Sequence, residues 1–197
     1  MGAMLDVIGA TIAGGVLILF ILNSMFTIQA LAFNTNMASN LIDITETVSS
    51  NLSTILDLVG SDIDSRPNAI WEADSTKFRF QAEFDVNDDG HLTDTDITIE
   101  QITDGNSNKQ LLVYHDDDTN NILLGPFRID NNDNLNFTYY DEFNNVIGSG
   151  ASLNDIRSVR VEIPFYDEGM NLTGSQQRDL VHNIVIWKFF KNLYLST

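Results

Sequence analysis

The chain contains no cysteine, which excludes disulfides, thiolate nucleophiles and zinc sites built on cysteine. It is also poor in basic residues: of its 197 residues, 10 are Lys or Arg and 28 are Asp or Glu, for a formal net charge of -18. Because nucleic-acid phosphates are bound by basic patches, this balance argues against a nucleic-acid partner. Multivalent cations are the partners that so acidic a chain favours.

No lysine or arginine precedes Arg66, and the same N-terminal part holds an almost wholly apolar run from Val7 to Phe33. A helix needs about 20 residues to cross the hydrocarbon core of a bilayer, so this run is long enough for a membrane span. A secretory signal peptide would have a basic start, a shorter apolar core of roughly 7–15 residues and a small-residue cleavage site. The run shows none of these features, and we interpret it as a transmembrane helix.

Beyond the apolar run, the pattern becomes amphipathic and predicts that the same helix continues to about Val59. Polar residues separate apolar ones that recur every three or four positions: Met37, Leu41, Ile44, Val48, Leu52, Ile55 and Val59. A bundle of helices needs such a seam outside the membrane, whereas a simple anchor does not. We therefore assign residues 1–60 to a hydrophobic and then amphipathic helix.

A connector over residues 61–76 contains Pro67, and the pattern then becomes that of short strands separated by Asp/Asn-rich turns. The predicted fold class is α+β, with the long helix followed by an antiparallel β-sheet domain over residues 77–197. Trp71, Trp187 and the Phe189-Phe190 pair are interpreted as core or edge packing. The expected strands are Lys77–Phe84, Ile97–Ile102, Gln110–His115, Asn121–Ile129, Leu135–Asp141, Ile156–Phe165 and Val181–Phe190.

The most specific local motif is the twelve-residue segment Asp85–Asp96, which fits a calcium-binding loop. Oxygen-bearing side chains stand at positions one, three and five, a glycine for the sharp turn stands at position six, and a backbone carbonyl follows at position seven. Aspartate at position twelve resembles dockerin-type loops more than the EF-hand, and Asp94 is an alternative ligand there. The predicted Ca²⁺ ligands are Asp85, Asn87, Asp89, His91, Asp94 and Asp96. The alternative is a hairpin turn without an ion.

The whole plan resembles that of type IV pilins and pseudopilins, in which a long apolar helix with an acidic residue near its start precedes a single β domain. The segments Leu135–Asp141, Asn145–Gly148 and Leu153–Ile163 are similar to the F-x-Y-x-D, G and I-R-x-V-x-I series of minor pseudopilins and PilW-like minor pilins. The resemblance covers the overall plan and roughly Phe78–Ile163. It implies a filament subunit, held in the membrane before assembly and packed through its helix afterwards.

The resemblance gives Asp6 and the amphipathic seam a role in assembly. A carboxylate among apolar helices is costly unless it is paired, and the α-amino group of an adjoining subunit would pair it and fix the axial register. Asp6 is the fifth residue if Met1 is removed, where the family has its Glu, but the family's basic leader ending in Gly is missing from this sequence. The alternative for Asp6 is a favourable place near the helix N-terminus. The expected assembly residues are Asp6, Leu41, Ile44, Val48, Leu52 and Ile55.

These observations predict a non-catalytic subunit of a type IV pilus-like or pseudopilus filament, because no pairing of a nucleophile with a base is recognisable in the sequence. The expected partners are further copies or other pilin-like subunits. The subunit would cross the inner, cytoplasmic membrane once, with its β domain outside the cytoplasm, on a cell-surface filament or a periplasmic pseudopilus. The alternative is a membrane-tethered, calcium-dependent binding or adhesion module that does not polymerise.

Overall fold

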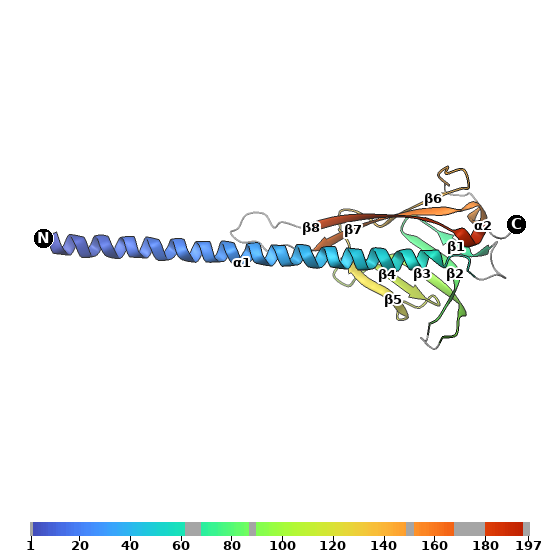
Figure 1. The fold of residues 1–197 in the computed structure, drawn as a ribbon, viewed down its shortest axis with the longest axis horizontal. Coiled ribbons are helices and arrows are strands. Elements are labelled where there is room, and N and C mark those ends of the chain that lie inside the picture. The colour runs from blue at the N-terminus through green and yellow to red at the C-terminus, as the bar shows by residue number, and fades with distance from the viewer. Residues whose placement is uncertain (1, 62–67, 87–89, 149–151, 168–179, 195–197) are drawn as a thin grey trace. The chain divides into compact units, whose positions relative to one another are not determined.

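The computed structural model describes residues 2–61, 68–86, 90–148, 152–167 and 180–194. The chain divides into two compact units, of which the first is Met1–Asn40 with Glu168–Leu180 and the second is Leu41–Asp167 with Val181–Thr197. The elements shown in Figure 1 are α1 (Gly2–Asp57), β1 (Ile70–Ala73), β2 (Lys77–Phe84), β3 (Thr93–Thr103), β4 (Lys109–His115), β5 (Ile122–Arg128), β6 (Asn136–Tyr140), η2 (Leu153–Asp155), β7 (Ser158–Asp167), β8 (Leu180–Phe189) and α2 (Lys191–Tyr194).

Helix α1 is a single helix of 56 residues, as the sequence predicts, and it ends two residues before the predicted limit. Within it, Thr11 and Thr27 donate their hydroxyl hydrogens to the carbonyls four residues earlier, so these polar groups are satisfied inside the helix. The turn that follows the helix ends at Gly60, whose φ of 70° is the left-handed conformation common after helix ends. A Cβ at Gly60 would lie 2.5 Å from the Leu193 side chain, so this position requires glycine for space as well.

The first sheet of the second unit is antiparallel, with five strands in the order β1-β2-β3-β4-β5. Strand β2 has the predicted bounds, whereas β3 begins four residues before its predicted start because Phe84 to Ala82 of β2 pair with Thr93 to Thr95. Strand β1 was not predicted and lies in the segment assigned to the connector. It is only four residues long and pairs with β2 across a bulge, so its sequence carries almost no alternation.

The second sheet has three strands in the order β6-β7-β8. Strands β4 to β8 match their predicted counterparts to within two residues at each end. Backbone hydrogen bonds join the two sheets: Phe137 N donates to Ser75 O over 2.8 Å, and Asp130 N donates to Pro164 O over 2.8 Å. The helix followed by two antiparallel sheets gives the predicted α+β layout. We call the two sheets of the second unit the β domain.

The core of the second unit is aromatic and includes the last turns of α1. The ring of Phe78 lies within 6.0 Å, centroid to centroid, of the rings of Phe80, Phe137, Tyr139 and Phe190. The α1 side chains with no exposed surface in this unit are Val48, Leu52 and Leu56, and Val59 in the following turn is equally buried. Each such apolar side chain stabilises the fold by about 1.5–3 kcal/mol relative to an exposed one.

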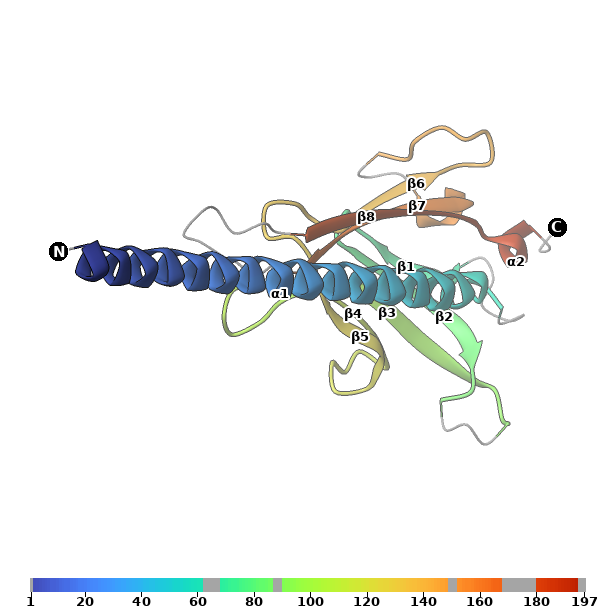
Figure 2. The same cartoon turned by 60° about the vertical axis from the view of Figure 1, so that its left-hand side comes forward.

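A polar contact also joins α1 to β8 within the second unit. The Lys188 ammonium lies 2.7 Å from Asp57 Oδ2 and donates to Ser53 Oγ over 2.7 Å. Figures 1 and 2 both show β8 running alongside the C-terminal part of α1. The end of the helix is therefore an integral part of the β domain.

Candidate functional sites

The first candidate site is the apolar part of α1, which is long and apolar enough to cross a membrane by length and composition. Its most apolar 18-residue window has a mean hydropathy of 2.1, and only 6% of that window is buried. Exposed apolar side chains recur from Met4 to Phe33 around the helix, and Asp6 is the one ionisable residue among them. For Asp6, the described part of the chain records no hydrogen bond or ion pair. The structure thus gives a possible single-pass anchor with a lone carboxylate near one end.

The predicted assembly seam divides into residues used inside the subunit and one that remains accessible. Leu41, Val48, Leu52 and Ile55 are buried, whereas the Ile44 side chain is 40% exposed. A helix turns through about 100° per residue, so Ile44 lies on the flank of the buried stripe. The seam that the periodicity revealed therefore packs mainly against the subunit's own β domain.

The face of α1 opposite the buried stripe is polar, and none of the predicted assembly residues lies on it. Ile42, on the other flank, is exposed and falls outside the periodic series, so the pattern did not single it out. Beyond the apolar run, α1 offers a partner a polar surface flanked by two isoleucines. The polar residues of this surface are Asp43, Glu46, Thr47, Ser50 and Asn51.

The predicted calcium loop is the second candidate site. Two of its predicted ligands, Asn87 and Asp89, lie outside the described residues. The backbone nitrogen of Gly90 donates over 2.8 Å to Oδ2 of Asp85, the first residue of the loop, and Gly90 has a φ of 82°. This positive φ is the conformation for which a tight turn uses glycine, as the loop pattern requires at position six.

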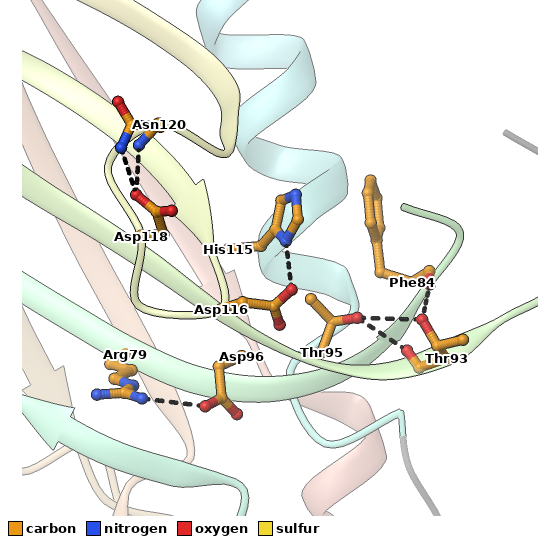
Figure 3. Close-up of polar contacts among 9 residues, drawn as sticks. All are labelled: Arg79, Phe84, Thr93, Thr95, Asp96, His115, Asp116, Asp118 and Asn120. Atoms are coloured by element: carbon orange, nitrogen blue, oxygen red, sulfur yellow. Dashed lines mark hydrogen bonds and ion pairs between the residues drawn. The ribbon is translucent and has the colours of Figure 1, made fainter. Parts of the chain in front are cut away.

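The carboxylate at position twelve of the loop, that of Asp96, bonds to a guanidinium. Arg79 Nη2 lies 3.0 Å from Asp96 Oδ2 across the β2–β3 pair (Figure 3). Arg79 Nη1 lies 3.1 Å from Asp117 Oδ2. The guanidinium also lies 5.1 Å from the Trp71 ring centroid. Burial lowers the pKa of Arg79, but the hydrogen bond to Asp96 and the charge of Asp117 outweigh it and raise that pKa above its ordinary value.

The remaining predicted ligands of the loop do not converge on one point among the described residues. Asp94 is exposed and pairs with Glu83 of β2, and the described residues contain no group of three or more His, Asp or Glu side chains placed to hold a metal ion. On the neighbouring turn, His115 Nδ1 lies 2.9 Å from Asp116 Oδ2 (Figure 3). A calcium ion would need the oxygens of Asn87 and Asp89 together with that of Asp85.

The acidic turns satisfy their carboxylates through their own amides, a feature that the sequence analysis missed. Asp104 Oδ1 accepts from the backbone nitrogens of Asn106 and Asn108, each over 2.8 Å, and Asp104 Oδ2 accepts from the Asn108 side chain. These hydrogen bonds lower the pKa of Asp104, and similar ones lower the pKa of Asp118 and Asp141. The available signal was an asparagine two or four residues after each aspartate.

In the Asp130–Asn134 turn, an ammonium group holds the backbone carbonyls. Lys109 Nζ donates to Asn131 O over 2.7 Å and to Asp133 O over 2.8 Å. The backbone nitrogen of Lys109 also donates to Asn131 Oδ1 over 2.9 Å. The ammonium group of Lys109 therefore occupies the position beside these oxygens that a metal cation would need.

Comparison of the chain with protein-family models, with curated proteins and with solved structures finds no match. What the structure establishes is a long apolar N-terminal helix followed by an antiparallel β domain. The pilin-like assignment consequently rests on the residues of this chain alone.

Proposed function

We propose that this protein is a non-catalytic subunit of a type IV pilus-like or pseudopilus filament. Its helix would hold the subunit in the membrane and would then pack against the helices of neighbouring copies or other pilin-like subunits. The observation that carries the proposal is the exposed apolar surface of α1 from Met4 to Phe33. Side chains so apolar need a bilayer or other helices around them, and a filament core exchanges the first for the second.

The lone carboxylate near the start of α1 supports assembly over simple anchoring. Asp6 would pair with the α-amino group of an adjoining subunit, and this pair would fix the axial register of neighbouring helices. A simple anchor does not require such a pair, and in it the carboxylate would gain only the favourable dipole of the helix N-terminus. The acidic β domain would face outward on the filament, outside the cytoplasm.

We further propose that the Asp85–Asp96 loop binds Ca²⁺. The spacing of its oxygen-bearing residues supports this proposal, as does the hydrogen bond from Gly90 N to Asp85 Oδ2. Without an ion, Asp85, Asp88, Asp89 and Asp94 place four like charges in one short loop, and these repel one another. Calcium would remove this repulsion and stabilise the pairing of β2 with β3.

A second candidate function is a membrane-tethered, calcium-dependent binding module that does not polymerise. One observation favours it: most of the amphipathic seam is buried in the subunit's own β domain, so the seam no longer implies a partner helix. In this alternative, the apolar part of α1 is only an anchor.

The two functions are separated by Asp6→Ala in the full chain, produced in its own cells. A filament subunit should appear in sheared filaments seen by electron microscopy, and Asp6→Ala should remove it from them while leaving its membrane fraction unchanged. The matched control is Asp43→Ala, which removes an exposed carboxylate from the polar part of the same helix. Wild-type amounts of filament from Asp6→Ala would refute the pairing role. Wild-type protein in the membrane without any filament would favour the tethered module.

A further inference from the structure

The outer face of β8 is the least protected strand surface in the β domain. Val185 is 55% exposed, Trp187 48% and Phe189 49%, and alternation puts all three on one side of the strand. The Trp187 ring stacks on that of Tyr140 at 4.8 Å, which places Tyr140 on the same side. Tyr140 itself is buried, and we call the three exposed residues, Val185, Trp187 and Phe189, the β8 stripe. It is apolar and open, whereas the opposite side of β8 contributes Ile186 to the core.

β8 is also an edge strand, and its own sequence lacks the features that usually protect an edge. It is ten residues long, without proline, aspartate or glutamate. Its one lysine, Lys188, bonds to Asp57 and Ser53 of α1 and so lies on the other side. Long apolar edges of this kind are places where another chain adds to a sheet.

The other edges of the described sheets are protected, which makes β8 distinct. Strand β1 has four residues and a bulge, and β5 contains Pro126 and shifts in register. The free edge of β6 bonds to two segments of the same chain, since Phe137 N donates to Ser75 O and Ile147 N donates to Tyr139 O. Of the four edges of the described sheets, β8 is therefore the one whose own sequence carries no such protection.

Charge indicates which partner fits. Residues 70–128, which form the five-stranded sheet and its turns, contain 13 Asp and Glu against 4 Lys and Arg. Residues 149–197, which include β7, β8 and α2, contain five of each. Two five-stranded sheets would repel each other, whereas the β8 stripe lies in a part of the chain without net charge, with Lys191 shortly after it, and carries no such penalty against an acidic surface.

We propose that the β8 stripe docks on the five-stranded sheet of a second copy of this chain. The contact is head to tail, because the two surfaces differ, and contacts of that type propagate along a filament. This inference rests on the proposed filament function. It adds a contact between β domains to the packing of the helices.

The test uses the absence of cysteine, because one introduced cysteine then carries a probe at a single known place. Asn183, exposed on the same side of β8 as the stripe, is changed to cysteine in the full chain and labelled with a maleimide photocrosslinker. Membranes and sheared filaments are irradiated, and covalent dimers are mapped by mass spectrometry. We expect a dimer in which the label has reacted with residues 70–128 of the second copy.

The specificity of the contact is tested at Val185. Val185→Glu should lower the dimer yield at least tenfold, a factor that corresponds to roughly 1.4 kcal/mol, since it replaces an apolar contact with a carboxylate that faces an acidic surface. Val185→Lys should retain more dimer than Val185→Glu, because lysine meets an acidic surface. Phe143→Glu, which changes an exposed aromatic residue in another turn, is the control and should leave the yield unchanged.

Each outcome decides between the claims. Equal yields from Val185→Glu and wild type, no dimer, or adducts with other proteins only would overturn the docking of β8 on a second copy. Equal losses from the Glu and Lys variants would exclude the acidic sheet as its receptor. Filaments without the crosslink refute this inference alone, whereas the absence of filaments from wild-type cells refutes the proposed function. An unchanged thermal midpoint of each variant shows that the fold is intact.

Discussion

Two aspartate substitutions four residues apart on α1, at Ile44 and at Val48, should differ sharply in their effect on stability. Val48 has no exposed surface and lies in the core of the second unit, whereas Ile44 is 40% exposed on its flank. Val48→Asp removes about 1.5–3 kcal/mol of apolar burial. It also buries an unpaired carboxylate, which adds a penalty of about 3–5 kcal/mol by comparison with broken buried ion pairs. The total approaches the roughly 5–15 kcal/mol that holds a domain together.

Ile44→Asp should lower the free energy of unfolding by about 1 kcal/mol or less, because the new carboxylate reaches water and the effects of surface substitutions mostly lie in that range. The measurement is thermal unfolding of the full chain in detergent, followed by near-ultraviolet circular dichroism of the buried aromatic residues. We expect Val48→Asp to lose the cooperative transition and Ile44→Asp to keep it. The matched control is Val48→Ala, which removes burial without adding a charge and should fall between them. A Val48→Asp transition at the wild-type midpoint would show that this part of α1 does not pack in the core.

Three further outcomes follow from the described contacts. Lys188→Met should lower the free energy of unfolding by about 1 kcal/mol, since the pair with Asp57 is only partly buried, and urea titration measures this loss. The three turn carboxylates with lowered pKa bind protons less readily in the folded state, so their contribution to stability is complete above the ordinary aspartate pKa of about 3.9 and is lost as the pH falls below it. A thermal unfolding midpoint that stays constant from pH 6 to pH 2.5, a range that includes the ordinary aspartate pKa of about 3.9, would contradict this. Millimolar Ca²⁺ should raise the thermal midpoint relative to chelator. The corresponding stabilisation is at most about 2.7 kcal/mol, the value for a free Ca²⁺ concentration of 100 times the dissociation constant. The response should vanish in Asp85→Ala/Asp89→Ala and persist in Asp141→Ala, and an equal response in both would remove the calcium claim.

The strands were predictable where apolar alternation lies between Asp/Asn turns, and they were missed where pairing alone defines them. β2 reads Lys-Phe-Arg-Phe-Gln-Ala-Glu-Phe, and its alternate residues are buried as the pattern requires. The first residues of β3 read Thr-Asp-Thr-Asp, with no apolar residue to mark a buried face. Thr95 is nevertheless buried opposite Ala82, because the neighbouring strand provides the partner. Only the tertiary pairing makes this segment a strand.

The α1 periodicity shows the limit of sequence reasoning about interfaces. A repeat of three and four residues identifies a buried face, but it contains no information on which surface buries it. The sequence predicted neighbouring helices as the partner of Leu52 and Ile55, whereas both are buried within the second unit. Likewise, Trp187 and Phe190 have the same aromatic character, but β8 directs Trp187 outward and the next turn directs Phe190 into the core.

The division of α1 changes what a filament would require of this chain. Because the periodic part is committed to the β domain, the apolar run alone would supply the continuous helix-to-helix surface, and Asp6 would be its single register mark. Contacts between neighbouring β domains then matter more than they would if the whole helix packed with its neighbours. The open β8 stripe is the described surface suited to such contacts, since it is apolar and free of acidic residues in a chain with a net charge of -18. A loss of assembly at β8 with intact membrane insertion would therefore place part of the assembly energy in the β domain and the remainder in the first half of α1.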